Sequence, residues 1–116
     1  MAQGIQISRD VQGRLVVRFG AGTDNEGVRQ AARALVDMVR PDDRQLVLIT
    51  EPGAFGREHG GIWAEELAPL KGQFKMTVMV GIRSSIARLA IGAMARLSGE
   101  RVRFCDREDD VPSLMA

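Results

Sequence analysis

Hydrophobic and polar positions near the N-terminus follow the period of strands. Ile5, Ile7 and Val11 lie at alternate positions of a polar stretch, which predicts a half-exposed strand. Residues 15–19 form a largely apolar run and predict a second strand. Because Gln12 and Gly13 between them are typical of a turn, the two strands are expected to form a hairpin.

Three later apolar runs predict strands that are covered on both faces. They occupy residues 46–50, 76–80 and 102–105. Between the strands, apolar residues recur with helical spacing and predict helices over residues 23 to about 40, 62–70 and 85–97. A final short helix is expected to begin at Asp109 or Asp110. Thr23 and Glu26 have the spacing of a capping box at the start of the first helix.

The resulting order is strand, strand, helix, strand, helix, strand, helix, strand, helix. Strands that alternate with helices imply crossover units and parallel pairing. We therefore expect an α/β fold with a mostly parallel mixed sheet of about five strands, an N-terminal β-hairpin and helices packed on the sheet. The expected domain spans residues 1–116.

The helix over residues 85–97 is apolar on nearly its whole circumference. Its expected core stripe consists of Ile86, Leu89, Ala90, Ala93 and Leu97. Ala87, Ile91 and Met94 fall outside this stripe, so either the helix is more buried than its neighbours or these residues form a surface. For them the sequence favours a homodimer interface, and the other alternative is the wall of a lipid pocket.

Composition narrows the functional classes. The chain has 116 residues, 45% of them hydrophobic, and its 16 basic and 15 acidic residues give a net charge of +1, which argues against nucleic acid as a partner. Cys105 is the only cysteine, so we expect neither a disulfide framework nor a cysteine-based metal site, and no cofactor. Without an apolar run of about 20 residues or a signal-peptide pattern, the expected location is the cytoplasm.

Several segments in sequence resemble the STAS domain, and within it the SpoIIAA-like group that shares its fold with Sec14-type lipid-binding modules. They are the strand over residues 46–50, the helix containing Trp63-x-x-x-Leu67, the strand within residues 74–81, and residues 102–106 ahead of an acidic helix start. The resemblance covers about residues 5–116.

The resemblance implies a possible regulatory mechanism. In sporulation-type STAS proteins, a serine or threonine at the start of the helix after the central strand is phosphorylated, and this breaks a complex with an anti-sigma factor. Residues 51–61 of this chain contain no hydroxyl side chain, and Thr50 at the strand end is the only nearby candidate. We therefore expect a partner-binding module that lacks the phosphorylation switch.

The glycine-rich loop over residues 51–61 and the helix after it form the predicted binding site, because open α/β sheets bind ligands beyond the carboxyl ends of their strands. The expected contacts are Phe55, Arg57, His59 and Trp63. The expected ligand is a protein partner or an apolar, lipid-like small molecule. Residues 72–107 hold seven basic and two acidic side chains, so contact with a membrane surface is a further possibility.

Catalysis is the alternative from a different functional class. His59 with a nearby carboxylate could serve a small hydrolase or transferase, and Cys105 could act as a nucleophile only if the fold brought it to His59. The sequence favours core packing for Cys105 and a binding function without enzymatic activity for the chain.

Overall fold

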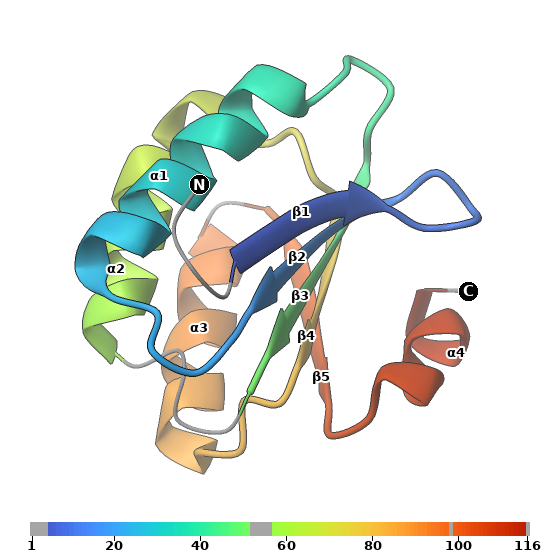
Figure 1. Cartoon of the computed structure of the whole chain (residues 1–116). Coiled ribbons are helices and arrows are strands. Elements are labelled where there is room, and N and C mark those ends of the chain that lie inside the picture. The colour runs from blue at the N-terminus through green and yellow to red at the C-terminus, as the bar shows by residue number, and fades with distance from the viewer. Residues whose placement is uncertain (1–4, 52–56, 98, 116) are drawn as a thin grey trace.

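The computed structural model describes residues 5–51, 57–97 and 99–115, and these form a five-stranded mixed sheet. The strands are β1 (Ile5–Arg9), β2 (Leu15–Phe19), β3 (Gln45–Thr50), β4 (Met76–Val80) and β5 (Arg101–Cys105). They lie in sequence order across the sheet. β1 pairs antiparallel with β2, and all later pairs are parallel, so β1 and β5 are the two edges (Figure 1).

Three crossover helices cover one face of the sheet. They are α1 (Asn25–Met38), α2 (Arg57–Glu66) and α3 (Ser85–Leu97), and a short 3₁₀ turn, Ala68–Leu70, follows α2. Each crossover joins neighbouring parallel strands with the same right-handed sense, so all three helices lie on the same side. A second 3₁₀ turn, Glu108–Asp110, leads into α4 (Val111–Met115), which lies on the opposite face (Figure 1).

Two hydrophobic clusters hold these layers together. The larger one lies between the sheet and α1–α3, and its fully buried side chains include Leu15, Val17, Phe19, Leu35 and Leu48. The smaller one lies under α4. It consists of Val16, Val47, Val78, Val80, Val111 and Met115. The β3 residues Leu46, Val47 and Leu48 divide between the two clusters, which confirms that this strand is covered on both faces.

The structure confirms the α/β architecture and the five strands, and it corrects three local predictions. Val11 is fully exposed in the turn after β1, because the strand ends at Arg9. Asp24, rather than Thr23, caps α1: its carboxylate accepts the Gly27 N–H, whereas the Thr23 hydroxyl donates to Gly20 O.

The third correction concerns the loop over residues 51–61. Helix α2 already begins at Arg57, five residues before the predicted start at Ile62. The sequence pattern did not predict this first turn because Gly60 and Gly61 follow it, and glycine has a low intrinsic helix propensity. Packing against α1 compensates, with Arg29 and Arg33 of α1 both paired to Glu66 at the end of α2.

Candidate functional site

The carboxyl ends of β3, β4 and β5 are tied together by short polar contacts. The Thr50 hydroxyl donates to Val80 O over 3.2 Å, and the Gly81 N–H donates to Cys105 O over 3.1 Å. Gly81 has φ +93°, and a Cβ there would lie 2.1 Å from Thr50 O. Only glycine fits this approach. Thr50 itself is 6% exposed, so its hydroxyl is committed to the inside of the fold.

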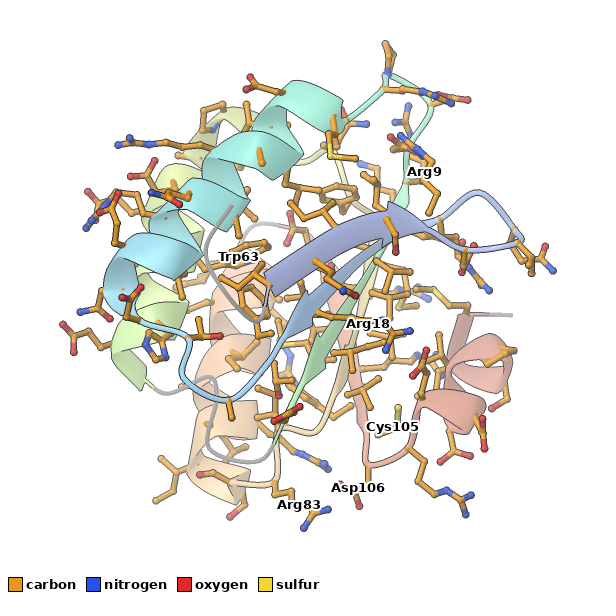
Figure 2. All side chains as sticks on the ribbon, viewed as in Figure 1. Arg9, Arg18, Trp63, Arg83, Cys105 and Asp106 are labelled. Carbon is orange, nitrogen blue, oxygen red and sulfur yellow. The ribbon has the colours of Figure 1, made fainter. Side chains whose placement is uncertain are left out.

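The residues predicted to contact a ligand have different environments. Trp63 is 7% exposed and packs edge-on against Phe19, with ring centroids 5.3 Å apart, so it belongs to the larger core (Figure 2). His59 lies in the first turns of α2 and is partly exposed. Phe55 lies outside the described residues, as does the side chain of Arg57.

His59 and Cys105 lie on opposite sides of the sheet. The Cys105 side chain packs against the smaller cluster, on the side of α4, while α2 covers the other face (Figure 2). The thiol donates to Arg107 O over 3.3 Å, and partial burial raises its pKa above the ordinary value. A thiol with a raised pKa is less often the reactive thiolate. This geometry fits the prediction that Cys105 packs as a small apolar residue.

Across residues 5–51, 57–97 and 99–115, no group of three or more His, Cys, Asp or Glu side chains could hold a metal ion. Over the same ranges no helix is both long and apolar enough to cross a bilayer.

Helix α3 packs with the opposite face from the one predicted. Ile86, Leu89 and Leu97, assigned to the core stripe, are 80%, 75% and 88% exposed. Ala90 and Ala93 of that stripe are exposed as well. The side facing the sheet instead carries Ala87 and Ile91, which pack against the larger core, and the buried Ala95.

Of the three residues predicted to form an interface or pocket wall on this helix, only Met94 is exposed, at 53%. Ala87 and Ile91 are directed toward the core. The reversal has a steric reason: the small side chains of Ala87 and Ala95 face the sheet and let the helix lie close to it, and the bulky residues then remain outside. The result is a helix whose outer face is the more hydrophobic one.

An open groove of about 530 Å³ runs between this helix and the edge strand β5. The helix contributes Arg88, Leu89, Gly92, Ala93 and Arg96, and the strand side contributes residues 100–104. Arg88 lies over one end of it. Its guanidinium carbon is 5.4 Å from the Phe104 ring centroid, its Nε donates to Ile82 O, and its Nη2 pairs with Asp106 at 3.0 Å.

Three arginines around this groove have no acidic partner among the described residues. Arg96, Arg101 and Arg103 are exposed and make no ion pair there. By contrast, Arg9 is paired with Asp43 and Arg18 with Glu108. The single acid of the groove, Glu100, is partly buried, and this desolvation raises its pKa. The groove is therefore a basic site with an apolar floor.

Comparison with solved structures identifies the fold. The chain is similar to the crystal structure of an uncharacterised protein of the DUF3478 family with a SpoIIAA-like fold from Shewanella loihica, with a TM-score of 0.61 over 97% of this chain and 92% of that one. The chain has the SpoIIAA-like fold. At 14% identity the likeness concerns the fold alone. No family model and no curated protein matches the sequence.

Sequence reasoning missed the groove of this SpoIIAA-like fold, although two signals were present. Arg101 and Arg103 alternate with Val102 and Phe104, which places positive charge on one face of a strand. Gly92 interrupts a segment whose other residues mostly favour a helix. Neither signal could be interpreted without knowing that β5 is an edge strand and that α3 lies beside it.

Proposed function

We propose that this chain is a non-enzymatic, SpoIIAA-like binding module of a regulatory kind, and that the outer face of α3 is its main contact surface. The observation that supports this is the exposure of Ile86, Leu89 and Leu97 on one helix face. Leaving such side chains in water forgoes roughly 1.5–3 kcal/mol each relative to full burial, and contiguous apolar patches of this kind mark interaction sites.

Two classes of ligand fit an exposed apolar helix face. One is a protein partner and the other is an apolar, lipid-like small molecule. His59 at the start of α2 is kept as a secondary contact, because α2 follows the carboxyl end of β3. A second copy of the chain is a third possible occupant, so the predicted homodimer is an outcome that the test below reports.

The module is proposed to act without the phosphorylation switch of sporulation-type proteins. Thr50, the only hydroxyl candidate near the loop, is buried and donates to Val80 O. A kinase would have to open the end of β3 to reach it. Adding a phosphate there would also place about two negative charges beside the close contact with Gly81.

The alternative function, a hydrolase or transferase that uses His59, requires a carboxylate to orient the imidazole. The adjacent Glu58 accepts a 2.7 Å hydrogen bond from Asn25 of α1, so this carboxylate already has a partner. Replacing His59 with alanine separates the two functions. Loss of any measured turnover would favour the enzyme, whereas unchanged ligand binding supports the module.

The proposed function is tested by native mass spectrometry of the protein purified from its own cells. We expect a bound partner or lipid on the wild type, and its loss from an Ile86→Glu/Leu97→Glu variant whose circular dichroism is unchanged, since both positions are exposed. A mass of two chains would identify a homodimer. If the wild type is a stripped monomer, or if the variant retains the same bound species, α3 is not the contact surface.

A further inference from the structure

The outer edge of β5 offers unpaired backbone groups. The Arg101 N–H donates to Lys75 O over 3.2 Å, and Cys105 O accepts the Gly81 N–H, so the odd-numbered residues of β5 direct their backbone groups toward β4. Backbone direction alternates along a strand, and Val102 and Phe104 therefore direct their N–H and C=O groups to the open side. No described strand pairs with that side. This edge can accept another strand.

The side chains of the same two residues form the apolar floor of the groove. Val102 and Phe104 pack against the larger core, and Leu89 and Ala93 of α3 line the same groove. At Gly92 a Cβ would meet no atom within 4 Å, so the helix wall is hollow at this point. An added strand could place every second side chain in this space, against a surface that is otherwise exposed to solvent.

The opposite face of the edge strand is basic. Because side chains alternate, Arg101 and Arg103 lie on the other side of the sheet from Val102 and Phe104. Both are exposed and make no ion pair with any described residue. Alternate side chains of an added strand would meet these arginines, and carboxylates are the groups that arginine pairs with best.

We propose that the groove between α3 and β5 binds an extended acidic segment of a partner protein, which adds to β5 as a sixth strand. Its apolar residues lie on Val102 and Phe104, and its Asp or Glu side chains pair with Arg101 and Arg103. Backbone hydrogen bonds supply affinity, and the alternation of side chains supplies specificity. This inference rests on the proposed binding function and names its partner class.

Charge and backbone hydrogen bonding argue against two other occupants of this groove, a second copy of the chain and an anionic bilayer. Pairing of two β5 edges from two copies would set arginines opposite arginines, which is unfavourable. An anionic bilayer could attract the arginines, but it offers no regular donors and acceptors to the backbone of Val102 and Phe104. An acidic strand satisfies both the charges and the backbone groups.

The test uses a fluorescent eight-residue peptide of alternating valine and glutamate, titrated into the full chain and followed by anisotropy. The Arg101→Glu/Arg103→Glu variant should bind it about tenfold more weakly or worse, because two exposed charges are reversed. Arg83→Glu is the matched control: it reverses an exposed arginine outside the groove and should leave binding unchanged. Hydrogen exchange should slow at the Val102 and Phe104 amides when the peptide binds.

Several results would overturn the inference. They are equal binding of a valine–lysine peptide, equal binding of a peptide N-methylated along one edge, or no added protection at the two amides. If the chain binds phosphatidylglycerol vesicles but not the peptide, and if this binding requires Arg101 and Arg103, the groove is a membrane-binding surface instead. If the peptide does not bind, but the Ile86→Glu/Leu97→Glu variant still loses the species bound to the wild type, this inference is rejected and the proposed function stands.

Discussion

Arg9 and Asp43 show how a single ion pair can fix two distant segments of the chain. Arg9 ends β1 and Asp43 precedes β3, and their side chains meet in two contacts of 2.8 and 3.0 Å. The Asp43 side chain is only 10% exposed and also accepts the Arg40 N–H. The hydrogen bonds from Arg9 hold the pKa of Asp43 below its ordinary value, and the carboxylate raises the pKa of Arg9.

We predict that Asp43→Asn lowers the free energy of unfolding by about 1 kcal/mol near pH 7. Since folding lowers the pKa of Asp43, its stabilising contribution is fully present above the ordinary aspartate pKa of about 3.9 and is lost as pH falls through the lower folded value. Urea unfolding of both proteins over this range should therefore show the difference shrinking in acid. The exposed neighbour Asp42→Asn is the control, and a pH-independent difference would contradict the assignment.

At the scale of the element, α3 decides what the molecule presents to its surroundings. The helix begins at Ser85 and ends at Leu97, as its sequence predicts. Its rotation about its own axis is reversed from the prediction, so that Ala87, Ile91 and Ala95 face the sheet. Two isoleucines of one helix, Ile86 and Ile91, thus have opposite environments.

Truncating these two isoleucines should separate the two faces. Ile91→Ala should lower the free energy of unfolding by about 1–3 kcal/mol, because it removes packing against the larger core. Ile86→Ala should change it by no more than about 0.5 kcal/mol, because the side chain is 80% exposed. Thermal or urea unfolding measures both. Equal losses at the two positions would show that Ile86 is covered in solution, and the reverse order would place the predicted stripe in the core after all.

For the whole molecule, the two faces of the sheet are unequally protected. Three helices cover one face, and among the described residues only the five-residue α4 lies on the other. Val111 and Met115 of α4 are buried against Val47, Val78 and Val80, and the ion pair between Arg18 and Glu108 holds the approach to α4 beside β2. The smaller cluster on this face of the sheet therefore depends on one short helix.

We predict that Val111→Asp destabilises the whole chain by about 3 kcal/mol, since it places a carboxylate in the smaller cluster. The exposed Ser113→Asp adds the same charge two residues away and should cost little. Denaturation and binding of a hydrophobic dye measure the result. A folded Val111→Asp chain of wild-type stability would show that α4 does not cover the sheet in solution.

The sequence by itself determined the strands, their mixed pairing and the limits of α3. Continuous apolar runs such as residues 46–50 are favourable only when covered on both faces, and strands that alternate with helices pair in parallel. These are local properties, and the SpoIIAA-like resemblance agreed with them. The position of β5 as a free edge comes from the strand order of the folded sheet, which no local pattern predicted.

Only the tertiary structure decided which face of α3 is buried, that Trp63 packs on Phe19, and that arginines and an apolar floor meet in one groove. A helix that is apolar all around can bury either side, and the choice depends on how closely its backbone can approach the sheet. The start of α2 at Arg57 likewise depends on its packing against α1. Periodicity measures the preferences of one segment, whereas burial is a free energy shared between segments that meet only in the folded chain.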